Sequence, residues 1–285
     1  MDSAQVSLLL SGEKFQKSKT SLHDLLQAYD SFEGIIDCTY SNAVGKARFF
    51  ESDRKNYQII IKETKDNSWE SFFDIIVAAS PVLFGNPLSP SDLLATAKAT
   101  FDFLKCSFEL KAKGEKYQIN NDSNGTVNLV TEGGNQYNFH APVSINLVVN
   151  AKDMLPEVEK IVELIDKGSL ETAIIQNELK TKVIELNKND SSLFKLEEKL
   201  GSEYYEFEGE IYRYNKRSRT GRLQVKELQE LPVGNYTFKV SDPRIQDDVI
   251  ISMIKKITPI SVKPVVVDDP ITNEELIQYL EIIDV

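Results

Sequence analysis

The residues of this chain best suited to chemistry form one short basic and aromatic stretch. Its members are Tyr212, Arg213, Tyr214, Lys216, Arg217, Arg219 and Arg222. Clustered cations can contact phosphates, and exposed tyrosine rings offer faces on which bases can stack. Tyr212 and Tyr214 are two residues apart, so on a strand we expect both rings on one face. The stretch therefore indicates a possible contact with nucleic acid or a nucleotide, but a solvated or protein-contacting turn is the favoured interpretation.

The charge of the whole chain works against the first interpretation. The 285 residues include 33 Lys and Arg and 44 Asp and Glu, which gives a formal net charge of −11. From Gly201 onward, 15 acidic residues outnumber 11 basic ones. An acidic molecule repels phosphate at long range, so a nucleic-acid contact must come from the local cluster. The sequence thus favours a protein partner or self-assembly, with nucleic acid as a second kind of partner.

Elsewhere the sequence shows no pattern of a catalytic or metal site. The segment Ser11–Lys14 has one glycine and lacks the spacing of a phosphate-binding loop. His23 and His140 stand apart from any nucleophile motif, and the two cysteines, Cys38 and Cys106, are too few for a four-ligand zinc site. We therefore expect no catalytic residue, no metal and no cofactor. The alternative from another class is an enzyme or toxin that acts on nucleotides or nucleic acids through a dispersed site.

The basic stretch lies in a C-terminal module that we predict over residues 201–285. Its predicted strands are Tyr204–Tyr214, Arg222–Glu227, Asn235–Val240, Ile260–Val267 and Leu276–Ile283, with a helix that starts at Ser241-Asp242-Pro243. Three strands, a helix and two further strands are the order of an oligonucleotide-binding (OB) barrel. The basic stretch falls at the first turn, where such barrels often hold a ligand. A polar segment, Asn187 to Gly201, separates this module from the rest.

Residues 1–190 predict an α+β interaction domain. The expected elements are a strand at Val6–Leu10, a helix from Ser21 to about Gly45, strands at Arg48–Glu51 and Tyr57–Glu63, a helix at Trp69–Ala79, a helix after Ser89-Pro90, a β-meander at about 115–150 (Tyr117–Val149), and a helix at Met154–Lys167. Thr172–Gln176 and Lys182–Leu186 predict two strands, with one continuous helix as the alternative.

Helical spacing assigns two apolar faces to the core of this domain. The first helix contributes Leu22, Leu25, Leu26, Tyr29, Phe32 and Ile36, and the helix after Pro90 contributes Leu93, Leu94, Ala97, Phe101, Leu104 and Phe108. The whole chain is therefore predicted to be α+β, with a mixed helix and strand domain followed by a small OB-like barrel.

The chain also resembles a group of uncharacterised bacterial and phage proteins associated with mobile elements or antiphage defence. The matching features are the strand Val6–Leu10, the helix Leu22–Asp37 with its Asp24-Leu25-Leu26 step, the Ser68-Trp69 pair before an apolar segment, and the turns Asn120–Gly125 and Gly133–Asn135. The resemblance implies a cytoplasmic protein that works within a larger system. It carries over no functional residue.

Two further observations bear on the surroundings of the protein. The longest apolar stretch, Phe72–Phe84, contains Asp74 and Pro81 and is shorter than the ~20 residues that a membrane-spanning helix needs. The first residues, Met1-Asp2-Ser3, lack the basic region of a signal peptide. We therefore expect a cytoplasmic, non-enzymatic binding or assembly component without a membrane role.

Overall fold

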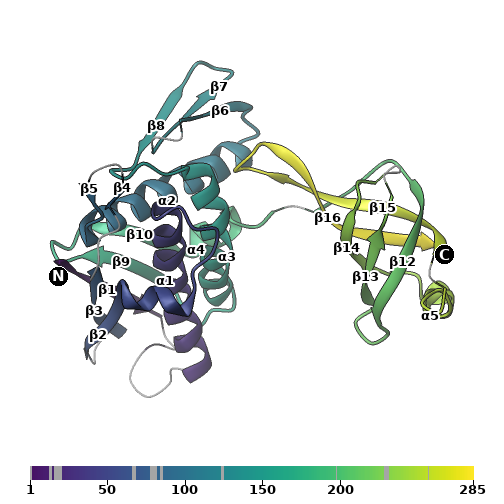
Figure 1. Ribbon diagram of the computed structural model, residues 1–285, viewed down its shortest axis with the longest axis horizontal. Coiled ribbons are helices and arrows are strands. Elements are labelled where there is room, and N and C mark those ends of the chain that lie inside the picture. Colours follow the sequence, from purple (N-terminus) through teal and green to yellow (C-terminus); the bar gives the residue numbers. More distant parts are fainter. Residues whose placement is uncertain are drawn as a thin grey trace. The chain divides into compact units, whose positions relative to one another are not determined.

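The chain is a mixed α and β protein that divides into two compact units (Figure 1). The computed structural model describes residues 2–12, 15, 21–65, 69–77, 82–83, 86–122, 125–196, 198–227, 231–255 and 257–285. The N-terminal unit comprises Met1–Lys195 and Pro270–Asn273, and the C-terminal unit comprises Leu196–Asp269 and Glu274–Val285. The chain thus enters the C-terminal unit, returns to the N-terminal unit for four residues, and ends in the C-terminal unit.

The N-terminal unit is built on a five-stranded antiparallel sheet with the strand order β10-β9-β1-β3-β2. The strands are β1 (Asp2–Ser11), β2 (Tyr57–Lys65), β3 (Trp69–Val77), β9 (Thr172–Asn177) and β10 (Lys182–Asn187). Along β3, Phe73, Ile75 and Val77 are buried on one face, and the Phe73 ring contacts the rings of Tyr29 and Phe32 in the first helix. The helices therefore pack on this face of the sheet.

Four helices of this unit are described: α1 (Leu22–Ala43), α2 (Pro90–Ala112), α3 (Leu147–Asp166) and α4 (Lys188–Leu193). Each of the first three starts where a side chain accepts a hydrogen bond from the first turn, at Ser21, Ser89 and Asn146. Gly45 and Gly168 follow α1 and α3 with φ of 71° and 65°, a conformation that glycine adopts without strain. The predicted starts at Ser21 and Ser89 are confirmed. The predicted ends of α1 near Gly45 and of α3 before Gly168 are confirmed as well.

The predicted inner face of α2 is confirmed, because all six of its residues are buried. The predicted face of α1 is confirmed only in its second half. Phe32 and Ile36 are buried, whereas Leu22 is 68% exposed and Leu26 is also exposed. The three long helices meet at Asn150, whose buried amide donates to Thr100 Oγ1 at 2.7 Å.

Three predicted elements of the N-terminal unit are wrong. Trp69–Val77, the described part of the predicted helix, is strand β3, since its burial alternates and it pairs with both β1 and β2. Arg48–Glu51 is not a strand and leads into the short 3-10 helix η2 (Glu51–Lys55). Ile145–Val149 does not extend the meander, because the Asn146 side chain caps α3, which starts at Leu147.

The remaining strands of this unit form small antiparallel sheets. The meander consists of β6 (Tyr117–Asp122), β7 (Thr126–Thr131) and β8 (Gln136–His140), and a short pair consists of β4 (Val82–Leu83) and β5 (Asn86–Pro87). Thr172–Asn177 and Lys182–Asn187 are two paired strands, which excludes the helix that the sequence left open. Ala78 and Ala79 lie outside the described residues, as do Ser123 and Asn124 in the first meander turn.

The C-terminal unit contains a closed five-stranded barrel. Its strands are β12 (Tyr205–Asn215), β13 (Thr220–Val225), β14 (Gly234–Lys239), β15 (Thr258–Asp269) and β16 (Glu274–Asp284). They pair in the order β12-β13-β14-β16-β15, and β15 closes on β12. The β14–β16 pair is parallel and the others are antiparallel. All five predicted strands are confirmed within a few residues.

Two short helices and an edge strand complete the barrel. The 3-10 helix η3 (Pro243–Ile245) and helix α5 (Gln246–Ser252) follow β14, and β11 (Lys199–Leu200) pairs with β15. Apolar side chains from the strands and Val249 of α5 fill the interior. Within the described part of the chain, every helix is too short or too polar to cross a lipid bilayer.

Candidate functional site

The predicted site residues occupy the end of β12, the turn that follows and the start of β13. The turn is ordered by its own polar groups, since Asn215 Oδ1 accepts from the backbone nitrogens of Arg217 and Ser218 at 3.0 and 3.3 Å. Arg219 has φ 54°, and its guanidinium lies 3.5 Å from the carbonyl oxygen of Ser241. The cations of the turn therefore project from a defined backbone conformation.

A β-bulge at Tyr212 decides which side chains leave the barrel. Ile211 pairs with Leu223, whereas Arg213 pairs with Arg222, so Tyr212 is an extra residue in β12. Tyr212, 46% exposed, and Arg213 consequently both lie on the outer surface. The next residue, Tyr214, packs against the barrel interior. The prediction that Tyr212 and Tyr214 share one face is wrong because of this extra residue.

Tyr214 contributes to the barrel rather than to its surface. Its ring stacks on Phe238 with the centroids 5.9 Å apart and the planes 10° from parallel. Gly221 lies opposite both rings, and a Cβ atom at this glycine would be 2.2 Å from the Phe238 ring. Burial raises the pKa of the Tyr214 hydroxyl. Tyr214 is therefore not available to stack on a base, and Tyr212 is.

Arg213 and Arg222 form the most unusual feature of this surface. They stand directly opposite each other in the β12–β13 pairing, and both are exposed. Neither makes an ion pair with any residue that the structure describes. Like charges opposite each other on a sheet destabilise it. The pair is thus a local cost to the fold that a bound anion would remove.

Two residues of β14 extend this cluster and were missed by the sequence reasoning. Thr237 pairs with Arg222, and Lys239 pairs with Thr220, so both lie on the same outer face. The Lys239 ammonium sits 3.6 Å from the centroid of the Tyr279 ring. Their alternation with buried Phe238 in the predicted strand was the signal that could have found them. We call the whole surface the basic face: Tyr212, Arg213, Lys216, Arg217, Arg219, Arg222, Thr237 and Lys239.

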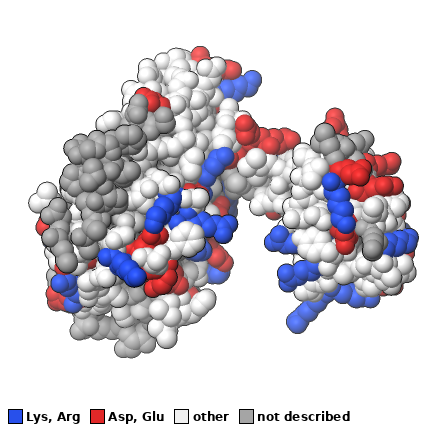
Figure 2. Space-filling view, in the orientation of Figure 1, with Lys and Arg blue, Asp and Glu red and all other residues white. Residues whose placement is uncertain are grey.

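Charge on the barrel is segregated along the strands. Figure 2 shows lysines and arginines gathered at the lower end of the C-terminal unit, where the β12–β13 turn lies, and acidic side chains at its upper end. Toward the acidic end of β12, Glu210 pairs with Lys226. On the basic face itself, Lys216 contacts Asp247 at 3.1 Å, but both are well exposed, and such a pair contributes little.

A groove elsewhere on the barrel has the opposite character. It has a volume of about 500 Å³ and is lined by Glu198, Asp242 and Glu281 among apolar side chains. Each of these carboxylates accepts a hydrogen bond, from Tyr279, Arg244 and the Ser241 nitrogen respectively. The Arg244 guanidinium lowers the pKa of Asp242 to about 2. This groove therefore repels anions and strengthens the segregation of charge.

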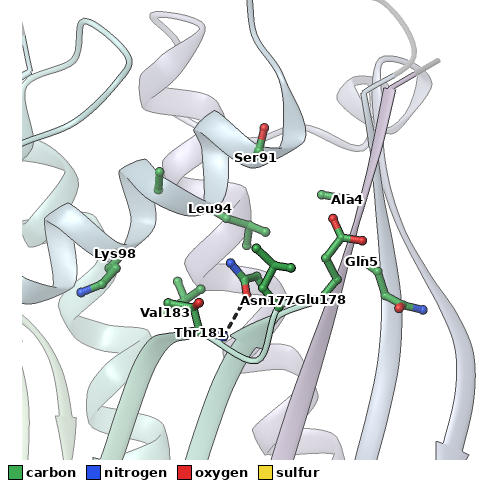
Figure 3. A pocket seen from close by; sticks show the side chains of 11 residues that line it. Ala4, Gln5, Ser91, Leu94, Lys98, Asn177, Glu178, Thr181 and Val183 are labelled. Carbon is green, nitrogen blue, oxygen red and sulfur yellow. Dashed lines mark hydrogen bonds between the residues drawn. The ribbon is translucent and has the colours of Figure 1, made fainter.

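The N-terminal unit contains a smaller pocket of about 280 Å³ between α2, β1 and the β9–β10 turn (Figure 3). Its floor is apolar, with Leu94 and Val183, and several of its polar groups contact other groups of the protein. Asn177 Oδ1 accepts from the Thr181 nitrogen at 2.9 Å, and Lys98 pairs with Asp102. Among its described lining residues, no hydrogen bond or ion pair joins Ser91 or Thr181 to Lys98 or Glu178.

The other candidate chemical groups from the sequence lie apart from one another. Cys38 and Cys106 are free, and burial raises the pKa of the Cys38 thiol to about 12 and that of Cys106 to about 11. His140 shares a hydrogen bond with Thr126 across two strands of the meander. Among the described residues, no three His, Cys, Asp or Glu side chains are grouped to hold a metal ion. The basic face is thus the best-formed candidate site.

In comparisons with known proteins, no protein-family model, no curated protein and no solved structure matches the chain.

Proposed function

We propose that the C-terminal unit is an OB-type module that binds single-stranded nucleic acid on its basic face. The strand order supports the OB assignment, since the third and fifth strands of the barrel are parallel neighbours and a helix separates the third strand from the fourth. In barrels of this type the second and third strands and the first turn commonly contact the ligand. The basic face occupies this position.

The observation that carries the proposal is the facing pair of Arg213 and Arg222, which no acidic side chain in the described part of the chain neutralises. A phosphate group between the two guanidiniums replaces their repulsion with charge-assisted hydrogen bonds. The exposed Tyr212 ring beside them offers a stacking surface for a base. Stacking of this kind requires an unpaired base, so the proposed ligand is single-stranded and is bound with little sequence preference.

The acidic end of β12 limits the path of the ligand. Glu206 and Glu208 continue the strand beyond Glu210 and are exposed. Carboxylates repel phosphates, so we place the bound nucleic acid at the end of the barrel that carries the β12–β13 turn. The turn between β15 and β16, a second ligand contact in many OB barrels, belongs here to the N-terminal unit. There Tyr117 Oη donates to the Pro270 carbonyl oxygen at 2.6 Å.

The wider role that we propose is a non-enzymatic binding or assembly component in the cytoplasm, within a system of antiphage defence or a mobile element. The resemblance of the chain to bacterial and phage proteins of that kind supports this setting. Turnover of a nucleotide or nucleic acid by the pure protein, abolished by a single substitution, would contradict it.

The test is fluorescence anisotropy with labelled oligo-dT, oligo-rU and a matched duplex over a range of salt concentrations. The wild-type protein should bind both single strands at low salt and the duplex more weakly. The double variant Arg213→Ala/Arg222→Ala should lose about 30-fold or more in affinity, and the salt dependence should fall by about one unit of slope, because both arginines contact the same phosphate. Charge reversal of Lys216, Arg217 and Arg219 to Glu should abolish binding.

A matched control removes two cations from the N-terminal unit instead. Lys167 and Lys182 are exposed, and each pairs with a glutamate three or four residues away in the sequence. The variant Lys167→Ala/Lys182→Ala changes the net charge by the same amount and should bind like the wild type. An equal loss of affinity in both double variants would show that binding depends on the net charge of the protein and not on the basic face. No binding by the wild type at low salt would end the proposal.

A further inference from the structure

The barrel has a second exposed surface, formed by α5 and the turn after it. Five large apolar side chains lie exposed within eight residues: Ile250, Ile251, Met253, Ile254 and Ile257. Ile254 is 86% exposed, whereas Val249, on the opposite side of the helix, is fully buried in the barrel. We call these five residues the α5 patch. Apolar side chains concentrated in this way on an otherwise charged surface mark an interaction site.

The patch has charges of opposite sign at its two ends. Asp247 and Asp248 lie in the first turn of α5, and Lys255 follows its last residues. The helical path continues beyond Ser252, since the Ile254 and Lys255 nitrogens donate to the carbonyls three residues before them. Asp248, Ile251 and Lys255 are three and then four residues apart, so they lie along one side of this path.

Two of these charges have no oppositely charged partner among the described residues. Asp247 is held by Lys216 of the β12–β13 turn, at 3.1 Å. Asp248 and Lys255 make no ion pair with any residue in the described part of the chain. An apolar stripe with an unpaired acid at one end and an unpaired base at the other is complementary to itself when a second copy runs in the opposite direction.

We propose that the α5 patch is the interface of a homodimer in which two α5 helices pack antiparallel about a two-fold axis. With the axis between Ile251 and Ser252, Asp248 of each copy faces Lys255 of the other, and the two Ile251 side chains pack against each other near the axis. Such an interface is isologous, so every contact occurs twice. A second copy fits this surface better than a uniformly acidic or basic partner, which would match only one end of the stripe.

The dimer is weak. Five side chains cover much less than the ~800 Å² that each partner of a stable complex usually buries. We therefore expect a dissociation constant on the order of 10–100 µM, which sedimentation equilibrium can measure over a suitable concentration range. This interface does not depend on the nucleic-acid proposal, because it uses none of the residues whose substitution tests that proposal.

The test is sedimentation equilibrium of the full chain carrying charge reversals. Asp248→Lys and Lys255→Asp each place like charges across the axis, and each should weaken the dimer at least about tenfold. The combination Asp248→Lys/Lys255→Asp restores opposite charges across the axis and should restore dimerisation. A folding defect cannot give this restoration. Lys182→Asp, a charge reversal in the N-terminal unit, is the control and should dimerise like the wild type.

Three results would overturn the proposal. The first is a wild-type protein that stays monomeric at the highest concentration reached. The second is a dimer that persists at full strength in Ile254→Asp, which places a charge in the centre of the patch. The third is a double variant that remains as weak as the single ones, since this would mean that Asp248 and Lys255 do not face each other. Circular dichroism of every variant confirms that the fold is intact.

Discussion

Two buried polar groups of the N-terminal unit and one charged pair of the barrel differ in how far neighbouring groups satisfy them. In the N-terminal unit, the buried amide of Asn150 is bonded to a hydroxyl of a neighbouring helix, and buried Asp190 pairs with Lys105. In the barrel, Arg213 and Arg222 face each other without a neutralising partner among the described residues. Polar groups that satisfy one another stabilise a fold, whereas those left unsatisfied at a surface indicate where a ligand binds.

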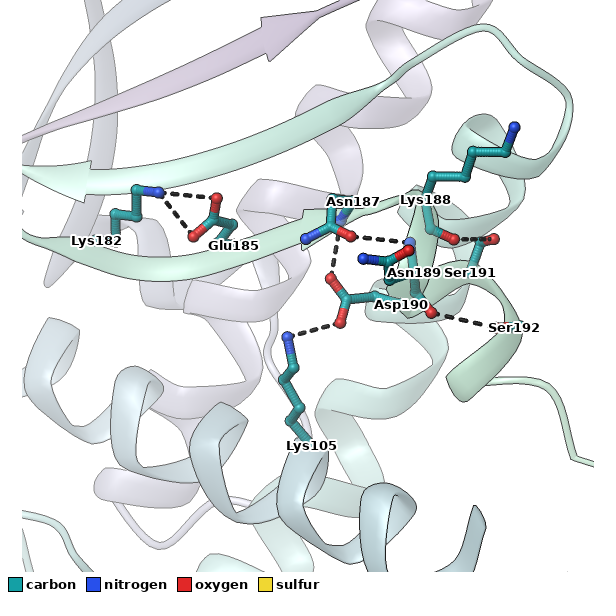
Figure 4. Close-up of polar contacts among 9 residues, drawn as sticks. All are labelled: Lys105, Lys182, Glu185, Asn187, Lys188, Asn189, Asp190, Ser191 and Ser192. Atoms are coloured by element: carbon teal, nitrogen blue, oxygen red, sulfur yellow. Dashed lines mark hydrogen bonds and ion pairs between the residues drawn. The ribbon is translucent and has the colours of Figure 1, made fainter. Parts of the chain in front are cut away.

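Asp190 shows how completely a polar group of the N-terminal unit is satisfied (Figure 4). One carboxylate oxygen lies 2.6 Å from the Lys105 ammonium of α2. The other accepts from the Asn187 nitrogen at 2.9 Å and so caps α4. The same view contains a contrasting pair on β10, Lys182 and Glu185, which is exposed to solvent. The two pairs therefore allow a comparison within one unit.

The largest effect on stability that we expect is from Asp190→Ala. The substitution leaves the partly buried Asn187 backbone nitrogen without its acceptor and Lys105 without its partner. It should lower the free energy of unfolding of the N-terminal unit by about 3 kcal/mol. Glu185→Ala, which breaks the exposed pair, should cost less than about 1 kcal/mol. The one tryptophan, Trp69, lies in β3, so its fluorescence in a urea titration follows this unit. Equal costs for both substitutions would contradict the comparison.

Sequence reasoning succeeded where a single residue type dictates the local structure. Ser89 and Pro90 marked the start of α2, and the helical spacing of its apolar residues identified the face that is buried. The five barrel strands were found from alternation and turns. The segment Trp69–Val77 was misread because apolar residues occupy both of its faces, which hides a period of two. Its true structure depends on pairing with strands on both sides.

The candidate site could be located from the sequence, but its geometry could not. The cluster of cations at the first barrel turn was visible in the residue types alone. Arg213 lies opposite Arg222 only because of the bulge at Tyr212. If β12 kept the register in which Ile211 pairs with Leu223, Arg213 would lie opposite Gly221. A bulge is a property of two paired strands, so one strand read alone does not reveal it. The same extra residue turns Tyr214 inward.

A second prediction tests how tightly the barrel interior is packed around Gly221. In Gly221→Ala, the new methyl group would lie 2.2 Å from the Phe238 ring and 2.4 Å from the Arg213 carbonyl oxygen, so strands β12 and β14 must shift. We expect a loss of about 2 kcal/mol in barrel stability. In Gly234→Ala the nearest atom is 3.6 Å away, which is ordinary contact, and the loss should be under about 1 kcal/mol.

Hydrogen exchange of peptides from β13 and β14 measures both glycine variants within the barrel itself. Faster exchange in Gly221→Ala than in Gly234→Ala is the expected result. Similar exchange in the two variants would mean that the stacked rings of Tyr214 and Phe238 yield easily.

The smallest change in stability, and the sharpest test of the comparison, is expected from Arg222→Glu. A glutamate opposite Arg213 converts a repulsive cross-strand pair into an attractive one, which should stabilise the barrel by about 0.5 kcal/mol. The same substitution places a negative charge in the centre of the basic face, so binding of single-stranded nucleic acid should be lost. Arg222→Gln separates the two contributions, because it removes the repulsion without adding an attraction.

Hydrogen exchange of β13 measures the effect of Arg222→Glu on stability, and anisotropy with labelled oligo-dT measures its effect on binding. Retained binding by Arg222→Glu would show that the paired arginines are not a ligand site.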